Sequence, residues 1–115
     1  MAVLKSETKN QQLISDLKVA TSFWARGKGL LGLKSLGREE ALWIHRCNSI
    51  HTFFMKFTID CVFLDKKMRI KAIYSDVKPN RLIWPVFGAR SVIELPAGRA
   101  KELNLQPGEQ LHVGY

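Results

Sequence analysis

Residues 58–64, TIDCVFL, constrain the fold of this chain more than any other segment, because all but one of them are apolar or β-branched. A run of this kind is typical of a β-strand that is covered on both faces. Asp60 conflicts with that environment, since burying a carboxylate without a partner costs several kcal/mol. We therefore expect cationic or amide groups around Asp60, and a polar site near the centre of the fold.

Other polar residues interrupt neighbouring apolar segments in the same way. Glu94 lies within the apolar run 91–95, and His51 lies within the aromatic stretch 50–57. Arginine matches a carboxylate well because its planar fork donates two parallel hydrogen bonds. The acids are expected either to anchor the structure or to converge with His51 and Thr52 in a cleft. The candidate cleft residues are Arg26, Arg46, His51, Thr52, Asp60, Arg90 and Glu94.

Short apolar segments separated by turn residues predict a mainly β fold. Strands are expected at 13–20, 41–45, 58–64, 68–74, 91–95 and 110–113. One helix is predicted from Thr21 to Leu31, and a second from Pro96, which suits a first helical turn, to Asn104. These elements indicate a β-rich α+β domain, an antiparallel or mixed sandwich or barrel-like sheet with two short helices. Residues 1–11 are expected to be a disordered tail before a single domain at 12–115.

The segment 75–90, SDVKPNRLIWPVFGAR, contains two prolines and a glycine, and it is expected to be a long loop. Loops of this length are usually functional or mobile. If Leu82, Trp84 and Phe87 are exposed, they form an apolar rim beside the cleft, which is typical of a ligand or partner site. The alternative is that these side chains cap an open end of the core.

Basic residues outnumber acidic residues by 18 to 10, which gives a net charge of +8. This excess is compatible with binding to nucleic acid or to an anionic membrane surface. The cations are scattered along the sequence, so electrostatic nucleic-acid binding is kept only as an alternative. No apolar run approaches the roughly 20 residues of a membrane span, and the N-terminus lacks the apolar core of a secretory signal. We expect a cytoplasmic protein and a monomer.

Histidine and cysteine residues near Asp60 suggest a metal site or a nucleophile as further alternatives. His45, Cys47 and His51 have the spacing H-x-C-x3-H, and Asp60 can serve as a fourth ligand. The spacing matches no standard zinc signature, so we expect no metal and no cofactor. Cys47 with His51 is the better nucleophile pair, because Cys61 lies in an apolar strand that disfavours a thiolate. Both cysteines are expected to be buried thiols.

Four segments carry a resemblance to a known family. They are ARGKGLLG at 25–32, IHTFFMKFTIDCVFLD at 50–65, VIELPAG at 92–98 and PGEQL at 107–111. With these segments in this order, the chain resembles the domain-of-unknown-function family numbered 192. The resemblance implies a compact, predominantly β fold like a small sandwich; it implies no activity, and many relatives look exported. The family positions carried over are Arg26, Gly29, Thr52, Met55, Asp60, Asp65, Glu94, Pro96 and Gly98.

These patterns favour a non-catalytic binding module with a polar cleft beside an apolar loop. Its partner is expected to be a small molecule or a protein. The main alternative is a small hydrolase or lyase, with Asp60 or Glu94 as the base or with Cys47 as a nucleophile and His51 as its base. Electrostatic binding to nucleic acid is the second alternative.

Overall fold

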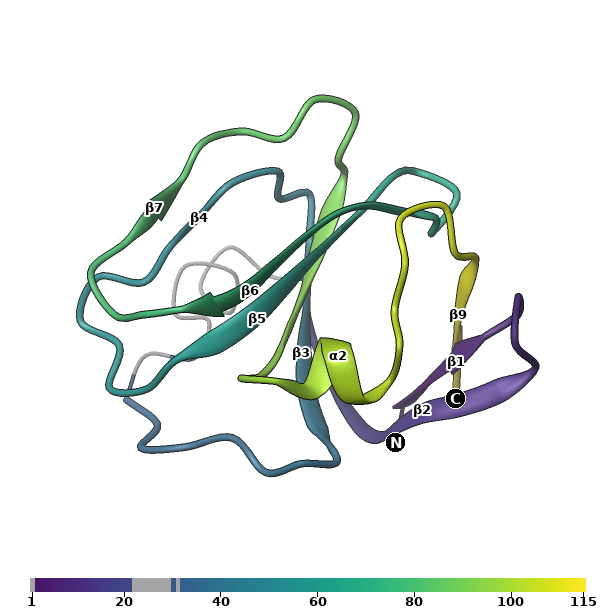
Figure 1. The fold of residues 1–115 in the computed structure, drawn as a ribbon, viewed down its shortest axis with the longest axis horizontal. Helices are drawn as coiled ribbons and strands as arrows, with labels where there is room; N and C mark the ends of the chain where they lie inside the picture. Colours follow the sequence, from purple (N-terminus) through teal and green to yellow (C-terminus); the bar gives the residue numbers. More distant parts are fainter. Residues whose placement is uncertain (1, 22–29, 31) are drawn as a thin grey trace.

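The computed structural model describes residues 2–21, 30 and 32–115, and most of its regular structure is β-strand (Figure 1). The strands of the main sheet are β1 Ala2–Ser6, β2 Gln11–Ala20, β3 Glu40–His45, β5 Ile59–Leu64, β6 Ile70–Val77, β8 Ser91–Pro96 and β9 Leu111–Gly114. A separate pair consists of β4 Ile50–His51 and β7 Leu82–Ile83. Among the described residues there is one short helix, α2 Arg99–Glu102.

The main sheet is mixed and curls into a half-barrel. Its strands lie in the order β6-β5-β8-β3-β2-β1-β9. Neighbouring strands are antiparallel except β2 and β3, which are parallel. In Figure 1 the sheet bends from β5 and β6 at one end to β1, β2 and β9 at the other, and α2 lies against β5 and β8. The predicted mainly β, barrel-like mixed sheet is therefore confirmed.

Residues 2–6 belong to this sheet, which corrects the expectation of a disordered tail over 1–11. β1 pairs with β2 on one side and with β9 on the other. Leu4 and Ser6 are buried, and burial alternates along the strand with the two-residue period of a strand covered on one face. The polar residues 7–10, which suggested a tail, form the turn between β1 and β2.

The main sheet carries a hydrophobic cluster on each face. Val62 and Leu64 of β5 belong to one cluster, and Cys61 and Phe63 of the same strand belong to the other. All six residues of β5 are buried, and the strand lies between β6 and β8. The prediction of a strand covered on both faces is confirmed.

Helix α2 is shorter than the helix predicted to begin at Pro96. Gly98 precedes it with a φ of 86°, a left-handed conformation that glycine adopts without steric cost. The chain therefore turns sharply after β8, and the helix begins only at Arg99. Of the helix predicted from Thr21 to Leu31, only Thr21 and Leu30 belong to the described residues, so the prediction itself lies outside them. No helix in the described ranges is long and apolar enough to cross a membrane.

The two short strands β4 and β7 form an arm that is set apart from the main sheet, at the upper left of Figure 1. We call residues 48–58 and 78–90 the β4–β7 arm. Ile50 and Ile83 are paired in it and are both buried. The long loop predicted at 75–90 therefore begins within β6 and contains the short strand β7.

Candidate functional site

Asp60 is 0% exposed in β5, and backbone N–H groups satisfy its carboxylate. Its Oδ1 atom accepts the N–H of Asp76 at 2.9 Å, and its Oδ2 atom accepts the N–H of Ala100 at 2.9 Å. Hydrogen bonds to an ionised group are stronger than bonds between neutral groups. Asp60 therefore ties β5 to β6 and to α2. Within the described ranges, no arginine side chain bonds to this carboxylate.

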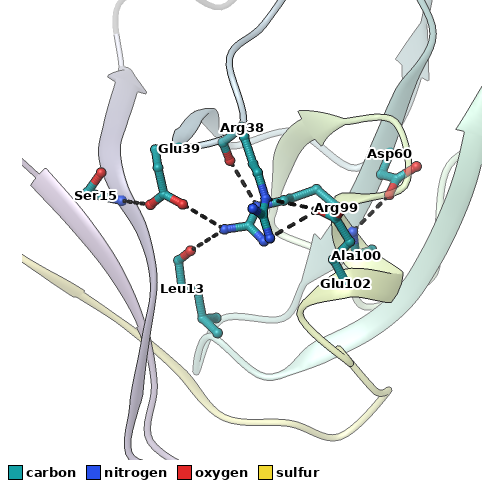
Figure 2. A network of polar contacts seen from close by, with 8 residues as sticks. All are labelled: Leu13, Ser15, Arg38, Glu39, Asp60, Arg99, Ala100 and Glu102. Atoms are coloured by element: carbon teal, nitrogen blue, oxygen red, sulfur yellow. Dashed lines mark hydrogen bonds and ion pairs between the residues drawn. The ribbon is translucent and has the colours of Figure 1, made fainter.

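Arg99 is absent from the predicted site, yet it lies at the centre of the polar network in Figure 2. Its Nε donates to the carbonyl of Arg38 at 2.9 Å. Its Nη2 donates to Glu39 Oε2 at 2.8 Å and to the carbonyl of Leu13 at 3.3 Å. Nη1 lies 3.5 Å from Glu102 Oε1. The buried Arg99 side chain thus joins α2 to β2 and to the segment before β3.

Glu94 lies in a more apolar setting than Asp60. Its side chain is 3% exposed, and in the sheet it is opposite Leu42 of β3 and Cys61 of β5. Burial raises the pKa of Glu94 to about 7. Among the described residues, its Oε1 atom has no hydrogen-bond partner. Glu94 is therefore a carboxyl group that keeps its proton at mildly acidic pH.

Asp60 and Glu94 point to opposite faces of the main sheet. Asp60 is opposite Leu95, which belongs to one hydrophobic cluster, whereas Glu94 is opposite Cys61, which belongs to the other. Residues directly opposite in an antiparallel pair share a face, and successive residues alternate between faces. The two acids are therefore not brought together in one cleft.

Two of the three arginines expected beside these acids form no ion pair with them among the described residues. Arg46 and Arg90 are exposed, and neither forms an ion pair with a carboxylate in the described part of the chain. The backbone of Arg90 is fixed, because its N–H donates to the carbonyl of Leu64 at 2.7 Å. Arg26 lies outside the described residues.

Thr52 joins the two halves of the β4–β7 arm. Its buried hydroxyl donates to the carbonyl of Lys78 at 2.6 Å and accepts the N–H of Arg81 at 2.8 Å. Its own N–H donates to the carbonyl of Arg81 at 2.8 Å. The neighbouring His51 is exposed and stacks on Phe53, with ring centroids 5.3 Å apart.

The two cysteines differ in environment. Burial, together with the negative charge of Glu94, raises the pKa of the Cys61 thiol. A thiolate is therefore disfavoured at Cys61, as its position in an apolar strand predicts. Cys47 is half-buried, and its Sγ donates to the carbonyl of Ser49 at 2.9 Å. Over the described ranges, no three His, Cys, Asp or Glu side chains are grouped so that they can hold a metal ion.

The predicted apolar rim is exposed on the β4–β7 arm. Leu82, Trp84 and Phe87 are 51%, 75% and 96% exposed. Phe53 and Phe54, which follow β4, add to this apolar surface, and Phe54 is 84% exposed. Neither phenylalanine was among the predicted rim residues. The sequence contains one signal for them. Phe53 and Phe54 are adjacent aromatic residues, which breaks the alternation expected of a strand that continues after His51.

Exposed cations accompany these aromatic side chains. They are Lys56, Lys78, Arg81 and Arg90. The two segments of the arm contain no aspartate and no glutamate. The arm therefore combines exposed apolar side chains with charges that are all positive. Of the predicted polar cleft residues, Arg46, Asp60 and Glu94 lie outside the arm, and Thr52 is buried inside it.

Relatives in the curated proteins share most of the length of this chain. UPF0127 protein PH1112 from Pyrococcus horikoshii is 32% identical over 114 residues, which cover 95% of this chain and 96% of that protein. UPF0127 protein TK1120 from Thermococcus kodakarensis is 32% identical over 108 residues, which cover 90% of this chain and 68% of that protein.

Two crystal structures share the fold. A protein of unknown function from Novosphingobium aromaticivorans has a TM-score of 0.83 at 19% identity, over 96% of this chain and 82% of that one. A putative transcription regulator from Sinorhizobium meliloti has a TM-score of 0.83 at 18% identity, over 97% of this chain and 91% of that one. The model of a family described as Uncharacterized ACR matches residues 3–113. The chain belongs to this family, the domain-of-unknown-function family numbered 192.

Proposed function

We propose that the protein is a non-catalytic binding module that docks on an anionic membrane surface through the β4–β7 arm. The observation that carries this proposal is the exposure of three large apolar side chains on the arm. Phe54, Trp84 and Phe87 are 84%, 75% and 96% exposed. A soluble domain gains nothing from leaving aromatic surface of this size in water, whereas such a patch is typical of an interaction site.

The arm is built as a fixed platform with an inner and an outer side. Ile50 and Ile83 form the inner pair and pack in a hydrophobic cluster of the body. His51 and Leu82, the next pair along the two strands, are exposed on the outer side. The buried hydroxyl of Thr52 bonds to the opposite segment. The aromatic side chains are therefore presented by an anchored element, which lowers the entropic cost of docking.

The charge of the arm favours an anionic membrane. Each Lys or Arg near an anionic leaflet contributes about 1 kcal/mol, and each fully buried large apolar side chain contributes about 1.5–3 kcal/mol. Four exposed cations and no acid therefore add to the apolar contribution. A second copy of the chain is disfavoured, because a symmetric contact would bring the cations of two arms together. Single-stranded nucleic acid also binds aromatic and basic side chains, so it is the competing outcome of the test.

Co-sedimentation of the full chain with lipid vesicles tests the proposal. Vesicles that contain phosphatidylserine should retain the protein more strongly than phosphatidylcholine vesicles, and salt should weaken the binding by screening. The variant Phe54→Ser/Phe87→Ser should bind about a hundredfold more weakly, since each of the two lost rings removes roughly 1.5 kcal/mol. Tyr115→Ser is the matched control, because Tyr115 is 89% exposed outside the arm.

Equal retention of the wild type and the double variant would contradict the arm as the docking surface. Binding to a single-stranded oligonucleotide, without binding to vesicles, would assign the same surface to nucleic acid if the double variant lost it. Circular dichroism of each variant confirms that the comparison is made between folded proteins.

A further inference from the structure

A depression of about 300 Å³ lies beside the turn between β5 and β6, where the β4–β7 arm returns to the sheet. It is lined by Asp65, Lys66, Lys67, Arg69, Gly88 and Arg90. We infer that this depression, which we call the turn pocket, binds a phosphate group. The inference goes beyond the proposed membrane docking, because it depends on the charges of the pocket and not on the aromatic side chains of the arm.

Asp65, the single acid of the turn pocket, is already paired within the turn. Its Oδ1 atom accepts the N–H of Lys67 at 2.8 Å and the N–H of Arg69 at 3.0 Å. Its Oδ2 atom lies 3.3 Å from Arg69 Nε. Burial acts to raise the pKa of Asp65, but the backbone hydrogen bonds and the Arg69 charge outweigh it and lower this pKa below its ordinary value. The carboxylate stays ionised, and Arg69 balances its charge.

The other cations of the turn pocket have no acid to balance them. Lys66, Lys67 and Arg90 form no ion pair with any carboxylate that the structure describes. Counting Arg69 and Asp65, the pocket therefore has four cations around one carboxylate. An excess of positive charge in a concave surface attracts anions.

The far wall of the turn pocket is fixed by the backbone. Gly88 has a φ of 82°, and a Cβ atom at this position would lie 3.2 Å from Lys71 Cε. The side chain of Lys71 therefore lies close to Gly88. Arg90 donates its N–H to the carbonyl of Leu64 and accepts the N–H of Cys47 at its own carbonyl. Its exposed side chain starts from a defined position at the edge of the pocket.

A phosphate group matches this set of donors better than a carboxylate does. A phosphate monoester carries between one and two negative charges near neutral pH and offers three acceptor oxygens. The arginine fork recognises two of these oxygens together, and lysine binds as a point charge. The pocket is open to solvent, so the group that bears the phosphate can extend outward. A free organic phosphate and a lipid headgroup share this chemistry, and the experiment separates them.

Titration of the isotope-labelled full chain with inorganic pyrophosphate, followed by NMR at constant ionic strength, tests the turn pocket. Saturable shifts are expected at the amides of Lys67, Arg69, Gly88 and Arg90. The variant Lys66→Gln/Lys67→Gln should have an affinity for pyrophosphate at least about tenfold lower than the wild type, since it loses two charged donors. The control Lys34→Gln/Lys101→Gln removes the same charge from exposed positions outside the pocket. This control should bind like the wild type.

Vesicles of matched surface charge distinguish the two sources of phosphate. A lipid source predicts that Lys66→Gln/Lys67→Gln loses more affinity for phosphatidic acid than for phosphatidylserine vesicles. A free organic phosphate predicts pyrophosphate binding with no preference between the vesicles. Shifts spread evenly over the basic surface, or an equal loss in the control variant, would overturn the pocket. Phe54→Ser/Phe87→Ser should keep pyrophosphate binding, so failure of the arm and failure of the pocket give different results.

Discussion

The Oδ2 atom of Asp60 lies 2.9 Å from the backbone nitrogen of Ala100. A carboxylate inside β5 therefore accepts a hydrogen bond from the first turn of helix α2, 40 positions later in the chain. The N–H of Asp76 occupies the other oxygen of the same carboxylate. The acid that conflicts most with its apolar strand therefore joins three elements of the fold. Exposed phenylalanine and tryptophan side chains lie elsewhere, on the β4–β7 arm. Three cations without an ion-pair partner among the described residues line the turn pocket.

Asp60→Ala should lower the free energy of unfolding by about 2 to 5 kcal/mol, because the buried N–H of Ala100 and the partly buried N–H of Asp76 lose their acceptor, at up to about 3 kcal/mol each. Urea unfolding measures the change. Asp76→Asn is the control, since Asp76 is exposed and its φ of 54° is one that asparagine tolerates. The control should stay within about 0.5 kcal/mol of the wild type. Equal stability of the two variants would contradict the anchoring role of Asp60.

Glu94 should make the protein less stable as the pH rises from about 4.5 to about 7. Burial raises the pKa of Glu94 from 4.5 to about 7, so the folded protein keeps a proton that the unfolded chain releases over this interval. The expected loss is about 3 kcal/mol, since one pKa unit corresponds to about 1.4 kcal/mol. Glu94→Gln cannot ionise, so above pH 7 it should gain stability relative to the wild type. If the free energy of unfolding changed with pH in the same way for the wild type and for Glu94→Gln, this prediction would be wrong.

Arg99→Gln should lower the free energy of unfolding by about 2 to 4 kcal/mol, because the buried guanidinium bonds to two carbonyls and to Glu39. Arg38→Gln is the matched control. The side chain of Arg38 is 70% exposed, and the bond from Arg99 goes to its backbone carbonyl. Thermal unfolding should show a large drop in melting temperature only for Arg99→Gln. If both variants lost the same small amount, the buried contacts of Arg99 would contribute no more to stability than an exposed side chain does.

Cys61 should react with an alkylating reagent only when the protein unfolds. Its side chain is buried, and burial together with the charge of Glu94 raises the pKa of its thiol, so little thiolate forms. In a Cys47→Ser variant, alkylation measured by mass spectrometry should be slow under native conditions and should accelerate in urea. Fast alkylation in native buffer would show that the interior beside Glu94 opens without unfolding.

The strands of the fold could be predicted from the sequence because their apolar residues recur with a clear period. The segments 13–20, 58–64 and 91–95 all lie in strands, within one or two residues of their observed ends. β1 was missed because polar residues after Ser6 masked a short alternation. β4 and β7 were missed because two-residue strands carry no period, and only pairing across the arm defines them.

The partners of the buried acids could not be predicted from the sequence. A pattern of residue types indicates that Asp60 needs donors, but it does not distinguish an arginine from a backbone N–H. Asp60 and Glu94 lie on opposite faces of the sheet because of the register of β5 against β8. In this register Asp60 is opposite Leu95, and Glu94 is opposite Cys61. Arg99 gives no signal of its own, although its position directly after Gly98 places it at the start of a helix.

The fluorescence of Trp84 tests the central claim most directly, because this residue is 75% exposed on the docking surface. On addition of phosphatidylserine vesicles, the emission of the wild type should shift to shorter wavelength as the indole leaves water. The variant Trp84→Phe should lose that shift and still bind, since the other rings of the arm remain. An unchanged emission spectrum in the presence of excess anionic vesicles, or the same shift in Trp84→Phe, would contradict docking through the β4–β7 arm.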